Sequence, residues 1–183
     1  MNVQVALGLC MLVSIAIAGC RSTTSQPQLP GGTYRNDTFH FSVSYPVGWQ
    51  VNVAPAATAS QGIPLHVVIT RTSTLQTTNA LISNCSILVL NPRDAEIATQ
   101  IKPLRARIQS KDTHLHAMLL GGQSGYREEP VQQEIPGTQA NDTHTNYYLL
   151  LNDYVYEIST DAISSDNADS VLQSMVASFT IVK

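Results

Sequence analysis

The sequence predicts an α+β fold, a single-domain layered sandwich in which a mostly antiparallel β-sheet is flanked by helices. Three observations support this prediction. Several segments alternate polar and apolar residues with a period of two, two pairs of segments are separated by tight-turn dipeptides, and only two segments have helical periodicity. Strands joined by tight turns run antiparallel, and helices that stand apart from them pack as a separate layer.

The predicted domain begins with an alternating strand. Between residues 39 and 45, aromatic and aliphatic side chains alternate with His and Ser, which predicts a strand with one buried face. Pro46-Val47-Gly48 interrupts the alternation, and another strand is expected from Trp49. Two later segments, 65–71 and 85–91, are rich in β-branched residues and predict further strands.

Two hairpins are expected in the second half of the chain. Segments 115–120 and 126–134 are predicted to pair across Gly121-Gly122, and segments 146–151 and 154–160 across Asn152-Asp153. The run GGQSG at 121–125 lacks the spacing of a G-x-S-x-G nucleophile elbow and the Lys of a phosphate-binding loop. A tight turn is therefore expected there.

Two helices are expected. In the first, four apolar residues fall on one face of a helical wheel, namely Ile97, Ile101, Leu104 and Ile108. Pro92 suits the start of this helix, and Pro103 is expected on its solvent side, where it would kink the helix. The second helix is predicted at 166–177, after the capping candidates Ser164 and Ser165, with an apolar face made of Val171, Leu172, Met175 and Val176.

The chain starts with an apolar run that stops at Cys20. The run is shorter than the ~20 residues of a bilayer-spanning helix, and an apolar run followed by small residues is typical of a cleaved signal peptide. The residues Ile17-Ala18-Gly19-Cys20 resemble the lipobox of bacterial lipoproteins. That resemblance implies cleavage between Gly19 and Cys20, and acyl chains on Cys20 that bind the protein to a membrane.

On this interpretation, residues 1–19 are the signal peptide, 20–33 are the lipidated cysteine with a flexible tether, and 34–183 are the folded domain. An ordinary secretory signal and an uncleaved anchor are the alternatives, and the first residues lack the Lys or Arg usual in a signal. The expected location is the cell envelope. Arg21, in place of an Asp, favours an outer membrane facing the periplasm if the host is Gram-negative.

The composition limits the possible partners. A net charge of -3 and a pI near 5.9 give no general attraction for nucleic acid. Cys10 would be lost with the signal, so Cys85 is alone in the domain and is predicted to be a small buried side chain rather than a reactive thiol. No cofactor is expected.

His114 and His116 are the candidates for metal chemistry. Two residues apart on a strand, both imidazoles project from one face, a spacing that zinc or copper can use. A third ligand could come from Asp112, His66 or His144, and the sequence does not choose among them. These histidines define the alternative function, a metal-dependent or hydrolytic enzyme of the envelope.

Charged residues are unevenly distributed along the chain. Nine acidic residues and no Lys or Arg lie between Glu128 and Val182. Basic residues instead crowd the first predicted helix and its flanks, namely Arg93, Lys102, Arg105, Arg107 and Lys111. The two segments could form opposite faces of a dipolar surface, or their charges could be dispersed over a solvated surface.

Two stretches of the chain resemble the PsbP-like domains. FHFSVSYPVGWQV at 39–51 is similar to the opening strand and Tyr-Pro-x-Gly-Trp turn of that family, and SMVASFTI at 174–181 is similar to its end. The resemblance implies an antiparallel sheet between helices. It also implies structural roles for Pro46 and Gly48, which shape the turn, and for Trp49, whose indole would fill the core.

The PsbP-like family includes photosystem subunits, a Ran-binding import factor, secretion chaperones and bacterial lipoproteins such as the DcrB group. It brings no catalytic residues to this sequence. The resemblance therefore implies a non-catalytic binding or assembly accessory with a protein partner in the envelope.

Overall fold

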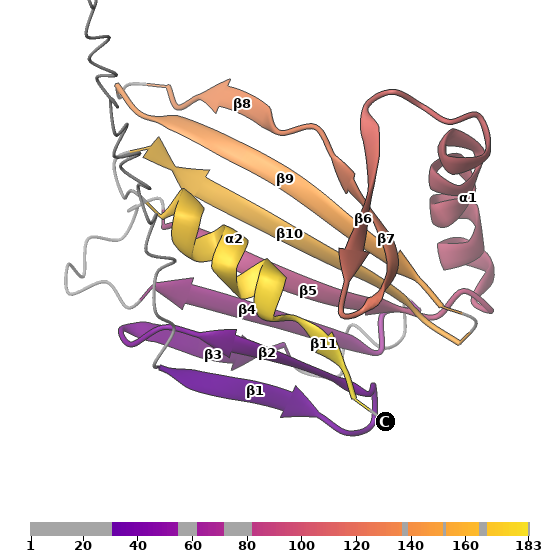
Figure 1. Cartoon of the computed structure of the whole chain (residues 1–183), viewed down its shortest axis with the longest axis horizontal. Helices are drawn as coiled ribbons and strands as arrows, with labels where there is room; N and C mark the ends of the chain where they lie inside the picture. Colours follow the sequence, from indigo (N-terminus) through magenta and orange to yellow (C-terminus); the bar gives the residue numbers. More distant parts are fainter. Residues whose placement is uncertain are drawn as a thin grey trace, which may run out of the picture.

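Two antiparallel sheets and two helices make up the described part of the chain (Figure 1). The computed structural model describes residues 31–54, 62–71, 82–136, 139–151, 153–164 and 168–182. The helices are α1 (Ala95–Gln109) and α2 (Asp169–Ser178), and within the described ranges neither is long and apolar enough to cross a membrane. The strands are β1 (Gly32–Asn36), β2 (Phe41–Tyr45), β3 (Trp49–Val53), β4 (Leu65–Arg71), β5 (Asn84–Leu90), β6 (Leu115–Leu120), β7 (Gln123–Glu128), β8 (Val131–Glu134), β9 (Asn141–Leu150), β10 (Val155–Ile163) and β11 (Thr180–Ile181).

The larger sheet has the strand order β3-β4-β5-β10-β9-β7-β6, and β8 pairs with β9 further along the edge that β7 occupies. The smaller sheet has the order β1-β2-β11. All of these strand pairs are antiparallel. A parallel bridge between Gly121 and Thr180 links the end of β6 to β11. The predicted α+β fold class is confirmed.

The two helices lie on opposite faces of the larger sheet. The pairs Val89–Tyr156 and Leu90–Val155 are neighbours between β5 and β10, and successive residues of a strand point to opposite faces. Val89 and Tyr156 belong to the main core, where α2 packs, whereas Leu90 and Val155 belong to a smaller cluster with Ile97 of α1. Leu88 and Leu150 pack against this smaller cluster, and the site described below lies on the same face of the sheet.

Three aromatic rings join the smaller sheet, α2 and the larger sheet. Phe41, Tyr156 and Phe179 are almost fully buried, and their ring centroids lie 5.5 to 6.0 Å apart. The Tyr156 hydroxyl donates to the carbonyl of Phe39 at 2.8 Å. Such ring pairs stabilise the core beyond their burial, by about 0.5–1.5 kcal/mol each.

The hairpin predicted at Gly121-Gly122 is confirmed. Leu120 pairs with Gln123, so the loop has two residues, with φ angles of 61° and 76°. Two consecutive positive φ angles suit a type I′ turn, which glycine adopts without steric cost. The β9–β10 hairpin is confirmed by its register, in which Leu150 pairs with Val155, although Asn152 lies outside the described residues.

The first predicted helix is confirmed, with a different start. Asp94 caps α1, because its carboxylate accepts hydrogen bonds from the backbone N–H groups of Glu96 and Ile97. Pro92 precedes this cap. Pro103 is exposed, as expected.

The second helix begins later than predicted. α2 starts at Asp169, and its N-cap Ala168 offers no side-chain hydrogen bond. The hydroxyl of Ser164 instead accepts from the Asn141 N–H at 2.9 Å, so this capping candidate is used to hold the start of β9. Ser165 and Asp166 lie outside the described residues.

Three further details differ from the sequence prediction. β1 begins at Gly32, at the end of the segment expected to be a flexible tether. The expected strand at 126–134 is divided into β7 and β8, because Pro130 lies between them and cannot donate a ladder hydrogen bond. Trp49 is only partly buried and packs against the margin of the core, because β3 is an edge strand.

The turn before Trp49 has the expected geometry. Gly48 has a φ of 79°, and the Trp49 N–H donates to the Pro46 carbonyl at 3.3 Å. Cys85 is fully buried, as predicted. Burial, with a smaller contribution from Asp161, raises the pKa of its thiol to about 12, so it is a packing residue at neutral pH.

Candidate functional site

The end of α1 places an arginine beside the β6–β7 hairpin. Lys111 has a φ of 55°, and the Asp112 N–H donates back to the Arg107 carbonyl at 3.0 Å. This is the hydrogen-bond pattern of a Schellman motif, in which the left-handed position usually holds glycine. The reversal brings the Asp112 carboxylate back to Arg107, in the last turn of the helix.

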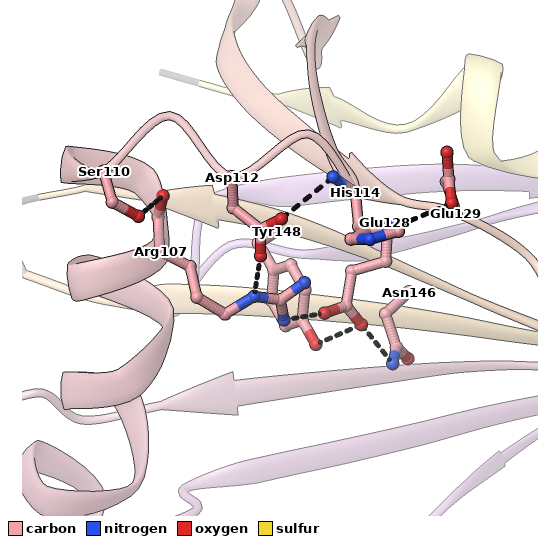
Figure 2. Close-up of polar contacts among 8 residues, drawn as sticks. All are labelled: Arg107, Ser110, Asp112, His114, Glu128, Glu129, Asn146 and Tyr148. Atoms are coloured by element: carbon pink, nitrogen blue, oxygen red, sulfur yellow. Dashed lines mark hydrogen bonds and ion pairs between the residues drawn. The ribbon is translucent and has the colours of Figure 1, made fainter.

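Arg107 joins two carboxylates from different elements (Figure 2). Its Nε lies 2.6 Å from Asp112 Oδ2, and its Nη1 contacts Glu128 Oε1. Both hydrogen bonds raise the pKa of Arg107 and keep it charged. Asp112 in turn accepts from the backbone N–H of His114 at 3.0 Å, so the helix end and the start of β6 are fixed together.

The second oxygen of Glu128 accepts two hydrogen bonds from β9. Asn146 Nδ2 donates at 2.9 Å and the Tyr148 hydroxyl at 3.1 Å. Burial alone would raise the pKa of Glu128, but the hydrogen bonds from Asn146, Arg107 and Tyr148 outweigh it and hold the pKa below its usual value. We call Arg107, Asp112, Glu128, Asn146 and Tyr148 the Arg107 network. These donors and acceptors are hydrogen-bonded to one another, so the network is suited to holding α1, β7 and β9 together.

The structure brings His114 and His116 together with Glu129. Glu129 Oε2 lies 2.7 Å from His114 Nδ1, and Glu129 Oε1 lies 3.5 Å from His116 Nε2. The carboxylate raises the pKa of His114, and the imidazole lowers that of Glu129. All three side chains are more than half exposed to solvent.

The expected third metal ligands are engaged elsewhere. Asp112 binds Arg107, His66 contacts Ser86 at 2.9 Å, and His144 contacts Asp161 at 2.6 Å. Among the described residues, no group of three or more His, Cys, Asp or Glu side chains is arranged to hold a metal ion. The histidine pair and Glu129 form an exposed polar cluster.

The contact between Glu129 and His114 could have been predicted from the sequence. Counting back from the two-residue loop at Gly121-Gly122 places Leu115 opposite Glu128, and therefore His114 opposite Glu129. Side chains directly opposite or diagonal across an antiparallel pair reach one another. The partner of Arg107, in contrast, depends on how α1 packs on the sheet, which the spacing of the sequence does not specify.

The outer edge of β6 has no strand partner along most of its length in the described part of the chain. His114 and Glu129 form a hydrogen-bonded backbone pair, so by alternation Ala117 and Leu119 direct their backbone N–H and C=O groups away from β7. Leu119 is 75% exposed. β6 contains no Pro, Lys, Arg, Asp or Glu, the residues that usually prevent an edge strand from pairing further.

The basic and acidic segments of the sequence meet in the structure. Arg93 pairs with Asp153 at 3.1 Å, and Arg107 pairs with Glu128. These contacts join residues near or within α1 to acids of the later segment. The charges partly neutralise one another, which differs from two separate charged faces. Gly19 and Cys20 lie outside the described residues.

Comparisons with known proteins describe the fold. No protein-family model and no curated protein matches the chain. A crystal structure from Bacteroides thetaiotaomicron is similar, with a TM-score of 0.53, 13% identity and coverage of 84% of this chain and 49% of that one. The chain thus spans about half of that protein's length.

Two further solved structures are similar to the chain. The cyanobacterial PsbP of Synechocystis has a TM-score of 0.49 and 15% identity, covering 82% of this chain and 91% of its own. LpqN of Mycobacterium tuberculosis, a protein involved in cell envelope biogenesis, has a TM-score of 0.46 and 13% identity, covering 84% and 86%. At these identities the likeness concerns the fold alone.

Proposed function

We propose that this protein is a lipid-anchored, non-catalytic accessory of the cell envelope that captures an extended segment of a partner protein along the edge of β6. The free edge of β6 is the observation that carries the binding part of this proposal. An exposed edge strand offers a row of unpaired backbone groups, and an extended peptide can extend the sheet by pairing with it.

The composition of β6 supports this use of the edge. Ala117 and Leu119 present the outward backbone groups, and the exposed Leu119 side chain offers an apolar contact beside them. The Arg107 network holds the base of the same hairpin against α1 and β9, so the edge is presented on a rigid support. A preorganised edge loses less conformational entropy on binding than a mobile one.

The lipobox residues at 17–20 support the anchoring part of the proposal. From Cys20 to the start of β1 at Gly32, the chain is rich in Ser, Thr, Gln, Pro and Gly, and it reaches at most roughly 40 Å when fully extended. Such a tether keeps the domain close to the membrane surface. The partner is therefore expected to be an envelope protein with a segment near that surface.

The chemistry of the described residues supports a binding role. The charged groups of the Arg107 network neutralise one another, and the Cys85 thiol is buried with a raised pKa. Neither is suited to activating a substrate.

Site-specific photocrosslinking tests the binding surface. A photoreactive residue replaces Leu119 in one variant and Val47 in the control variant, since both side chains are 75% exposed. In intact cells, we expect a discrete adduct at position 119 and none at position 47. Equal labelling at both positions, or adducts at neither, would contradict the proposed edge.

A proline substitution tests the pairing mode. Ala117→Pro removes an outward N–H while leaving the hydrogen bonds to β7 in place, so the adduct at position 119 should be lost while the fold is kept. Ala117→Ser keeps the N–H and should retain the adduct. If both variants crosslink equally, side chains rather than strand pairing hold the partner.

Mass spectrometry of the mature N-terminus tests the anchor. We expect a peptide that begins at Cys20 and carries acyl chains, and we expect Cys20→Ser to abolish this modification. Retention of Met1, or an unmodified Cys20 at the N-terminus, would refute the anchoring part of the proposal and leave the β6 test unaffected.

A further inference from the structure

A second candidate site lies on the face of the larger sheet opposite α1. A pocket of about 450 Å³ opens between the N-terminal end of α2 and strands β7 to β10. The polar residues that line it include Arg127, Gln132, Thr143, Thr145, Asp169 and Gln173. We call it the Arg127 pocket. Its volume lies within the range of small-molecule sites, and its lining combines hydroxyl, amide and charged groups.

Among the described residues that line this pocket, Arg127 is the one basic residue. It precedes Glu128 on β7, so its side chain leaves the opposite face of the strand from the Arg107 network. Its Nε is shielded from solvent and has no hydrogen-bond partner among the described residues. A shielded donor without a partner is unfavourable, and more so when the group is charged. Nε itself is covered, whereas the two terminal nitrogens of Arg127 are not shielded, so they are the donors that a ligand in the pocket can reach.

Of the described residues that line the pocket, Asp169 supplies the carboxylate. Its Oδ2 accepts from Gln173 Nε2 at 2.8 Å. Among the ion pairs of the described residues, none includes Arg127 or Asp169. The pocket thus presents a cation and an anion that are not paired with each other. A dianion such as phosphate would be repelled by Asp169, whereas a ligand with one charge of each sign would meet both groups favourably.

We propose that the Arg127 pocket binds a small zwitterionic carboxylate, such as an amino acid or a short peptide. The ligand carboxylate accepts from the two terminal nitrogens of Arg127, the end-on geometry in which a guanidinium donates two hydrogen bonds. The ligand ammonium group faces Asp169, and the threonine and glutamine side chains offer further hydrogen bonds. This site is separate from the β6 edge, and the proposal does not depend on partner capture there.

Three probes distinguish the features of the ligand. Glycylglycine carries both charges, acetate carries only the carboxylate, and glycinamide carries only the ammonium group. Each is titrated into the isotopically labelled full-length chain while backbone amide shifts are recorded. We expect saturable shifts at Arg127, Thr143, Thr145 and Ala168 with glycylglycine, weaker shifts with acetate, and none with glycinamide.

Two substitutions and one control complete the test. Arg127→Gln should weaken glycylglycine binding by at least about tenfold, the effect of losing a charge-assisted hydrogen bond. Asp169→Asn should weaken glycylglycine but not acetate, and Arg105→Gln, an exposed change on α1, should alter neither. The proposal is overturned if glycylglycine leaves the pocket amides unshifted at millimolar concentration, or if Arg127→Gln binds it as tightly as the unaltered chain.

Discussion

Two arginines beside the same hairpin differ in how their charge is satisfied. Arg107 contacts Asp112 and Glu128, and Glu128 also accepts from Asn146 and Tyr148. Arg127, on the other face of β7, has a shielded Nε without a partner among the described residues. Arg107 holds α1 against β7, whereas Arg127 still has hydrogen-bond donors that the proposed ligand would use. Because both residues are arginines, their neighbours rather than the residue type decide whether the charge is already paired.

Removing the first arginine should have the largest effect on stability. Arg107→Ala leaves Glu128 and Asp112 half-buried without their cation, and we expect a loss of about 1–2 kcal/mol, less than for a fully buried pair. Arg105→Ala, an exposed change on the same helix, is the control and should alter stability by under about 0.5 kcal/mol. Urea denaturation measures both. Equal effects would mean that the Arg107 network adds nothing to the fold.

The pH dependence of stability should report the same network. The pKa of Glu128 in the folded state lies below its usual value of 4.5, so its contribution to stability is present above pH 4.5 and is lost as the pH falls through the folded value. The free energy of unfolding should therefore decrease below pH 4.5. In Arg107→Ala the decrease should be smaller, since one cause of the lowered pKa is gone. Identical pH profiles would refute this assignment.

Removing backbone strain in the turn after α1 should have a smaller effect and should increase stability. Lys111 occupies a left-handed position at the helix end, with a φ of 55°. Lys111→Gly removes steric strain that outweighs the added chain entropy, and we expect an increase in stability of about 0.5–1 kcal/mol. Lys111→Ala, which keeps the Cβ, should give no gain. If Lys111→Ala also increases stability, the effect comes from loss of the lysine charge and not from relief of strain.

Changing the second arginine should have the smallest effect. Arg127→Met keeps most of the apolar side chain and removes the unpartnered donor, so stability should stay within about 0.5 kcal/mol or rise slightly. Thermal and urea unfolding measure this change in the absence of ligand. A loss as large as that of Arg107→Ala would show that Arg127 already has a structural partner.

Local patterns in the sequence predicted most of the fold. Alternation predicted β2, richness in β-branched residues predicted β4 and β5, and tight-turn dipeptides predicted the two hairpins. The start of α2 and the separation of β8 from β7 were not predicted correctly. Ser164 bonds to Asn141 at the start of β9 instead of capping the helix. Pro130 interrupts a segment whose other residues favour a strand.

The candidate sites were harder to predict from the sequence than the fold. The pairing of His114 with Glu129 follows from the hairpin loop and could have been derived by counting residues. The Arg107 network requires the packing of α1 on the sheet, and the Arg127 pocket requires the packing of α2 against β10. Both depend on contacts between segments far apart in the chain, whose geometry one sequence does not specify.

The bridge between Gly121 and Thr180 limits what the edge of β6 can do. An incoming strand could pair only along residues 115–119, a length of roughly 16 Å at about 3.3 Å per residue. Beyond this point β11 blocks further growth of the ladder. An edge closed at one end therefore admits only a short guest segment, and the glycine that forms the turn also sets the length of that segment.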